Sequence, residues 1–110
     1  MQQKIKVSNL FNVSVVKPNK ERFFPLINGE SFLSEKIISN GFKSPQSEWM
    51  SSNTKEWVVL IKGRARLEIE DGEVLNLKAG DYFLIPGKTK HRLLFTSKKP
   101  YCYWLAIHFK

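Results

Sequence analysis

The sequence predicts a single all-β domain, built as a sandwich or barrel of short strands. Three observations predict this fold. Helical periodicity is nearly absent, short apolar segments alternate with turn signals, and Asp71-Gly72 is typical of a two-residue hairpin. The length of 110 residues is that of one domain, and 42% hydrophobic residues are enough for a packed core. We therefore expect one domain over residues 1–110, with an N-terminal strand and irregular arm over residues 1–30 and the barrel over residues 31–110.

The first half of the chain predicts two strands, at residues 11–16 and 32–39. We expect residues 17–29, between them, to form an irregular connection. Residues 40–55 are polar, rich in Ser and without a clear period, which predicts a loop. We expect this loop to carry Trp49 toward an apolar surface.

The second half of the chain predicts six more strands, separated by turn signals such as Gly63 and Pro86-Gly87. The first is a continuous apolar run, typical of a strand that is covered on both sides. The second alternates strictly between apolar and charged residues, which predicts one buried face. The six strands are expected at residues 57–61, 64–70, 73–78, 82–85, 91–96 and 101–109.

The chain is strongly basic, with 18 Lys and Arg against 10 Asp and Glu and a formal net charge of +8. Such a charge can be the electrostatic footprint of a nucleic-acid-binding protein, or it can simply keep a small protein soluble. The cations are scattered, with no run longer than two, and no zinc-finger or RNP-type motif accompanies them. This distribution disfavours a nucleic-acid partner.

The sequence also restricts where the protein is expected to act. Its longest apolar run, at residues 57–61, is far shorter than the roughly 20 residues that cross a bilayer. No apolar segment typical of a secretory signal follows the N-terminus. A single cysteine, Cys102, excludes an internal disulfide and fits a reducing compartment. We expect a cytoplasmic protein with no membrane partner.

Residues 80–91, with the sequence GDYFLIPGKTKH, resemble the second sequence motif of the cupin superfamily. Gly80, Pro86 and His91 have the spacing of that motif. The motif's second glycine is replaced by Lys88, and Gly87 comes one residue earlier.

The first cupin motif is matched in part, because Glu56 and Gly63 fit its last two elements. Its pair of histidines is missing, and the corresponding positions fall on Met50 and Ser52, or on Trp49 and Ser51. The order of strands and turns from residue 56 to residue 109 resembles small single-domain cupins throughout. The resemblance implies a double-stranded β-helix, the jelly-roll barrel, with a pocket between two sheets.

The resemblance also implies a metal site, because cupins hold a divalent metal with histidines and a glutamate inside the barrel. Imidazole and carboxylate ligands suit Fe, Mn, Ni or Zn. The matching positions offer Glu56 and His91, and His108 could supply a third ligand. Two protein ligands are fewer than the three usual in a catalytic site.

Each of these residues has a structural alternative. His91 is either a metal ligand or a partly buried histidine that forms hydrogen bonds within the barrel, for example to Glu56. His108 could serve only packing in an aromatic strand. The expected ligand pocket comprises Glu56, His91, His108, Trp49 and Tyr82, although aromatic residues of this kind more often belong to the core.

Two functions from different classes remain open. The first is a small cupin that binds a polar or anionic small molecule, for sensing or for a reaction such as dioxygenation, isomerisation or decarboxylation. Lys88 and Lys90 lie in the turn before His91, where they could attract an anion. The second is a metal-free interaction module, whose basic surface around Lys88, Lys90 and Arg92 binds an anionic partner or nucleic acid. The resemblance further implies a homodimer, and we expect residues 11–16 to pair at its interface.

Overall fold

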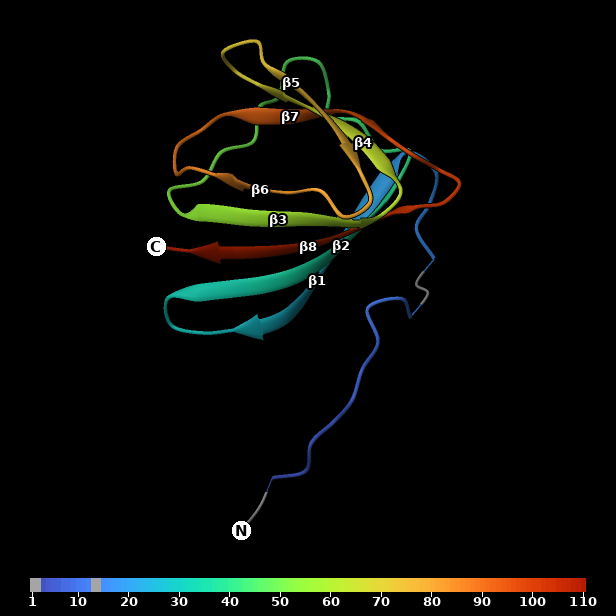
Figure 1. Cartoon of the computed structure of the whole chain (residues 1–110), viewed down its shortest axis with the longest axis vertical. Coiled ribbons are helices and arrows are strands. Elements are labelled where there is room, and N and C mark those ends of the chain that lie inside the picture. Colours follow the sequence, from blue (N-terminus) through green and yellow to red (C-terminus); the bar gives the residue numbers. More distant parts are fainter. Residues whose placement is uncertain (1–2, 13–14) are drawn as a thin grey trace.

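The computed structural model describes residues 3–12 and 15–110, which form eight strands in two facing antiparallel sheets (Figure 1). The larger sheet has the order β1-β2-β8-β3-β6 and the smaller sheet the order β5-β4-β7. The predicted all-β fold is confirmed, and the two sheets are those of a jelly-roll barrel. None of the described residues forms a helix that could cross a membrane. The strands are β1 (Lys20–Asn28), β2 (Phe32–Asn40), β3 (Lys55–Lys62), β4 (Arg64–Ile69), β5 (Val74–Lys78), β6 (Tyr82–Ile85), β7 (His91–Thr96) and β8 (Cys102–Phe109).

The strands of the second half lie where the sequence predicts them. β6 and β7 have the predicted bounds, and the ends of the other four strands lie within two residues of the prediction. Gly63, Asp71-Gly72 and Pro86-Gly87 each separate two of these strands. Alternation also predicts the buried face of β4 correctly, since Ala65 and Leu67 are both buried.

The structure of the first half of the chain differs from the prediction. Residues 11, 12, 15 and 16 lie outside the strands, so the expected strand at residues 11–16 is wrong where it is described, and residues 13–14 lie outside the described part. The segment expected to be an irregular connection forms β1 instead. It contains Pro25 at an irregularity in its pairing with β2, and proline is tolerated there because β1 is an edge strand.

A single residue, Gly63, carries the chain from the larger sheet into the smaller one, because β3 ends at Lys62 and β4 begins at Arg64. Its φ of +95° is in the region that favours glycine. A Cβ atom at this position would lie 2.8 Å from Ser97 Oγ and 3.0 Å from Cys102 Cα. This turn places the inner face of β4 opposite the inner face of β3.

The core fills the space between the sheets. Its members alternate along their strands with residues that face outward, as expected for half-buried sheets. Leu60 and Ala106 are fully buried at its centre. The cluster consists of Val58, Leu60, Ala65, Leu67, Ile85, Leu93, Cys102, Trp104 and Ala106.

The outer face of the larger sheet is covered in part by the N-terminal segment. Val16 is buried against Ile38 and Tyr103, and its carbonyl accepts a hydrogen bond of 2.8 Å from Asn40 Nδ2. Farther out, the Phe11 ring lies 5.5 Å from the Tyr103 ring. Residues 3–8 extend away from the barrel (Figure 1). In this arm the side chains of Ile5 and Val7 are more than nine-tenths exposed.

We propose that a second copy of the chain covers these exposed apolar groups in a homodimer. Ile5 and Val7 alternate with lysines, a pattern suited to strand pairing. The edge strand β6 offers Tyr82 and Leu84, both at least half exposed on the outer face. The arm at residues 3–8, and not residues 11–16, is therefore the segment we expect to pair.

Multi-angle light scattering tests this arrangement. We expect the full chain to have twice the mass of one copy, because pairing removes the exposed side chains of the arm and of β6 from water. A variant that lacks residues 1–8 and a Leu84→Lys variant should both shift toward the monomer. Val74→Lys, a comparable change on the smaller sheet, is the matched control. A monomeric wild type at high concentration would contradict the proposal.

Candidate functional site

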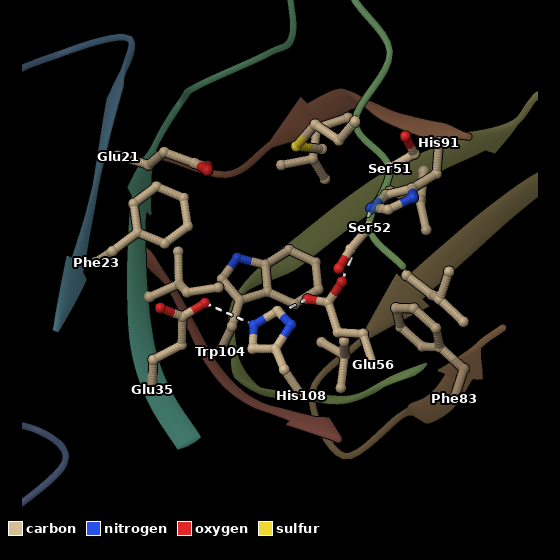
Figure 2. Close-up of a pocket in the computed structure, with 16 residues that line it drawn as sticks. Glu21, Phe23, Glu35, Ser51, Ser52, Glu56, Phe83, His91, Trp104 and His108 are labelled. Carbon is tan, nitrogen blue, oxygen red and sulfur yellow. Dashed lines mark hydrogen bonds and ion pairs between the residues drawn. The ribbon is translucent and has the colours of Figure 1, made fainter. Parts of the chain in front are cut away.

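A cavity of about 220 Å³ lies between the two sheets (Figure 2). Strands of both sheets and the loop before β3 contribute to it, and most of its wall is apolar. Its lining consists of Glu21, Phe23, Glu35, Ile37, Met50, Ser51, Ser52, Glu56, Val58, Leu67, Phe83, Ile85, His91, Leu93, Trp104 and His108.

Glu56 on β3 lies between two imidazoles. Its Oε1 is 4.0 Å from His91 Nε2, and its Oε2 is 3.9 Å from His108 Nε2. His108 is the residue directly opposite Glu56 in the pairing of β3 with β8. His91 comes from β7 in the smaller sheet, so the group joins the two sheets across the cavity.

His91 is held in a defined orientation. Its Nδ1 lies 3.1 Å from the carbonyl oxygen of Thr89, and a carbonyl can only accept, so Nδ1 carries the hydrogen. Nε2 therefore faces Glu56 and, in the neutral ring, has a free lone pair. The backbone of His91 exchanges two hydrogen bonds with Met50, of 2.8 and 2.9 Å, which attaches the loop before β3 to β7.

His108 is held by a second carboxylate. Its Nε2 lies 2.8 Å from Oε1 of Glu35 on β2, the strand next to β8 in the larger sheet. Both side chains are mostly buried, which strengthens this contact relative to a surface pair. Glu35 and Glu56 thus approach the same ring nitrogen from opposite neighbouring strands.

The buried position of Glu56 changes its acidity. Desolvation raises the pKa of Glu56 above its ordinary value, and the charges of His108 and His91 oppose this rise. Burial has the larger effect, so the protonated form of Glu56 is favoured relative to a carboxyl in water. The carboxyl group can therefore donate a proton to a molecule that comes within hydrogen-bond distance of it in the cavity.

Glu21 on β1 is a further carboxylate of the cavity, at some distance from Glu56 (Figure 2). Burial raises the pKa of Glu21 to about 7, a hydrogen bond from Ser39 opposes this rise, and the charge of Glu35 adds to it. Ser39 Oγ donates to Glu21 Oε2 over 3.3 Å and accepts from Trp104 Nε1 over 3.1 Å. Trp104, Ser39 and Glu21 thus form one hydrogen-bonded chain.

Three of the five residues that the sequence suggested for the pocket line the cavity: Glu56, His91 and His108. Trp49 does not, because its ring packs against the guanidinium of Arg92, 4.6 Å from the ring centre. Tyr82 does not either, and it is 69% exposed on the outer face of β6. Alternation explains this placement, since Phe83 and not Tyr82 points inward.

Glu21 and Glu35 were missed at the sequence level for different reasons. Glu35 lies in a predicted strand, and its alternation with Ile37 and Ser39 could have placed it on the inner face. Glu21 lies in the segment that was expected to be irregular, so no pattern assigned it a face.

The expected attraction of anions by Lys88 and Lys90 is not supported by their positions. Neither residue lines the cavity, and Lys90 Nζ lies 3.5 Å from Glu70 on the surface. Among the lining residues that the structure describes there is no lysine or arginine. The basic charge of the chain is therefore outside the cavity.

The residues present do not fit a metal held in the manner of the cupin motifs. Where that motif has its pair of histidines, the cavity is lined by Met50 and Ser52, or in the other register by Ser51, with Trp49 outside. The His108 nitrogen is already hydrogen-bonded to Glu35. Within residues 3–12 and 15–110, no three His, Cys, Asp or Glu side chains are grouped to hold a metal ion.

Comparison with known proteins shows one matching family and many solved structures of similar fold. Residues 37–108 match the sequence pattern of the Cupin domain family. Among curated proteins, none matches this chain. A solved structure from Ralstonia eutropha JMP134, described as a "putative mannose-6-phosphate isomerase", is 34% identical, with a TM-score of 0.89 over 96% of this chain and 99% of that one.

More distant structures share the fold. A protein of unknown function from Streptococcus pyogenes is 17% identical, with a TM-score of 0.74 over 98% of this chain and 90% of that one. The Cnp3 cupin domain of Schizosaccharomyces pombe is 14% identical, with a TM-score of 0.76 over 93% of this chain and 72% of that one. At these identities the comparison concerns the fold alone.

The raised pKa of Glu21 predicts how stability depends on pH. Because the pKa is about 7 in the folded protein against an ordinary 4.5, the folded state binds more protons than the unfolded state between these values. The free energy of unfolding therefore falls as the pH rises through this window. Gln cannot ionise, so Glu21→Gln should gain about 3 kcal/mol relative to the wild type between about pH 4 and pH 8.

Urea unfolding of both proteins at several pH values measures this difference, and any contribution of Glu56 is common to both. Glu73→Gln, in the exposed turn between β4 and β5, removes the same formal charge and should follow the wild type. If Glu21→Gln shows the pH dependence of the wild type, the assignment is wrong.

Proposed function

This chain belongs to the cupin family, and we propose on that basis that it binds a compact polar small molecule in the cavity of its barrel. One observation carries the proposal: Glu56 lies between the imidazoles of His91 and His108 inside a cavity that is otherwise mostly apolar. An apolar pocket with a few convergent polar groups is the usual form of a small-molecule site. A volume of about 220 Å³ restricts it to a compact ligand.

The same groups can move a proton. Nε2 of neutral His91 can accept a proton, and the raised pKa of Glu56 favours a carboxyl that can donate one. With both groups facing one cavity, a bound molecule could lose a proton at one atom and gain it at another, as in an isomerisation. The similarity to the Ralstonia protein described as an isomerase agrees with chemistry of this kind. A sensing role would use the same contacts without the reaction.

We propose that this site works without a resident metal. The fold is that of a cupin, but thioether and hydroxyl groups stand where a histidine pair would be needed. Dioxygenation is therefore not part of the proposal, whereas isomerisation is. We further propose a cytoplasmic setting, because Cys102 is a buried free thiol.

The competing function, an interaction module with a basic surface, has weaker support. Of the cations that would form its patch, Arg92 Nε lies 2.8 Å from Glu68 and Lys90 Nζ lies 3.5 Å from Glu70. Carboxylates thus already neutralise two of these positions. We do not propose nucleic acid as a partner.

A thermal-shift screen of compact polar molecules tests binding in the cavity. A ligand at a hundred times its Kd should stabilise the wild type by about 2.7 kcal/mol. Ser51→Trp places an indole at a position that lines the cavity and should abolish the shift. Ser47→Trp, an exposed position of the same loop, should retain it.

Glu56→Gln keeps the shape of the side chain and should weaken every ligand that stabilises the wild type. The binding proposal fails if Ser51→Trp and Ser47→Trp respond alike, because the molecules then bind elsewhere. It also fails if no compact molecule stabilises the wild type.

Elemental analysis tests the proposed absence of a resident metal. Protein purified without chelator or nickel resin should contain less than about a tenth of an equivalent of Fe, Mn, Ni and Zn together, because too few ligands converge. The double variant Met50→His/Ser52→His adds two imidazoles to a cavity that already holds Glu56 and His91, and it should take up about one equivalent. Stoichiometric metal in the wild type would contradict the proposal.

The pair Trp49→His/Ser51→His is the matched control for this experiment. It adds the same two side chains in the other register of the motif, where residue 49 lies outside the cavity. If this control takes up metal and the first pair does not, residues 49 and 51, and not residues 50 and 52, occupy the positions of the motif's two histidines.

A further inference from the structure

The ionisable groups that line the cavity differ from those of the whole chain, which is strongly basic. Three carboxyl groups line the cavity: Glu21 on β1, Glu35 on β2 and Glu56 on β3, all in the larger sheet. The described lining contains two imidazoles and neither lysine nor arginine. Carboxyl groups thus outnumber imidazoles in the lining by three to two, although the chain carries a formal charge of +8.

The imidazoles leave one carboxyl group without a cationic partner. His108 contacts Glu35 and faces Glu56, and His91 faces Glu56. Glu21 accepts a hydrogen bond from the neutral hydroxyl of Ser39 and has no cation within ion-pair distance among the described residues. A carboxylate in such a place takes up a proton unless another positive charge replaces it.

Aromatic groups border the same part of the cavity. Figure 2 shows Phe23 next to Glu21 on β1, and Trp104 bordering the space between them and Glu56. Ser39 links Trp104 to Glu21 through hydrogen bonds. Aromatic faces attract cations within about 6 Å, and more strongly where water is excluded. A positive group beside Glu21 would therefore have both a carboxylate and aromatic faces around it.

We infer that the cavity selects a monocationic ligand, such as a protonated amine on a compact apolar body, with its positive group between Glu21 and Glu35. This inference rests on the small-molecule binding proposed above and adds the chemical class of the ligand. The apolar wall of Ile37, Val58 and Leu67 would surround the body of such a molecule.

Binding should then depend on pH in a defined direction. The groups that face Glu21 are Glu35 on β2 and the thiol of Cys102 on β8, besides the hydroxyl of Ser39. A cation favours the ionised form of Glu21, so its affinity should rise up to about tenfold as the pH increases from roughly 6 to 8. An anion should show the opposite trend.

Three probes that share a phenyl ring isolate the effect of charge: benzylammonium, benzyl alcohol and benzoate. Calorimetric titration of the full chain at about pH 8 should show benzylammonium binding at least about tenfold more tightly than benzoate, with benzyl alcohol between them. Glu21→Gln should weaken benzylammonium about tenfold and leave benzyl alcohol unchanged. Glu73→Gln, which removes an exposed carboxylate, should behave as the wild type.

Any of the following outcomes would overturn the inference. Equal or tighter binding of benzoate would do so and leave the small-molecule proposal intact, since a ligand still enters the cavity. Benzylammonium binding that Ser51→Trp does not weaken would place the cation outside the cavity. If none of the probes binds while other molecules from the thermal-shift screen do, only the inference fails. If nothing binds, both fail.

Discussion

The two sheets meet across the cavity at a carboxyl group that lies between two imidazoles. Glu56 belongs to one sheet and His91 to the other, so their approach within 4.0 Å requires the sheets to face each other at this position. Buried charge is costly unless it is matched, and here the matching groups come from β7 and β8. The one-residue crossing at Gly63 makes this possible, because it places strands adjacent in sequence in opposite walls.

The cavity shows how far a fold can be retained while the chemistry of its site changes. Cupin architecture depends on turns and apolar alternation, and Gly63, Gly80 and Pro86 still occupy their places. The ligand set depends on a few side chains in one loop, and there Met50 and Ser52 line the cavity. A thioether and a hydroxyl are weaker ligands for transition metals than a pair of imidazoles. The ionisable groups of the site are three carboxyl groups and two imidazoles, which interact with protons and with each other.

Much of the fold and part of the site could be predicted from the sequence. The second half is punctuated by glycine and proline and alternates cleanly, so six strands were predicted within two residues at each end. β1 was missed because it is an edge strand with Pro25 in it, and because contacts distant in sequence bury Glu21. Tyr82 was expected in the pocket, although the period of a strand turns it outward. Trp49 lies in a loop, where no period assigns a direction.

The loop before β3 has a consequence beyond the cavity. Ser44 and Met50 form backbone hydrogen bonds to Leu93 and His91, along the side of β7 that faces away from β4. Without these hydrogen bonds, this edge of β7 would be a template for aggregation. The segment that shapes the cavity is thus also the protective border of the smaller sheet. Insertions or substitutions that enlarge the cavity by loosening this loop would also expose the edge of β7 and favour aggregation. The need to keep this edge covered therefore limits how far the loop can change to accept other ligands.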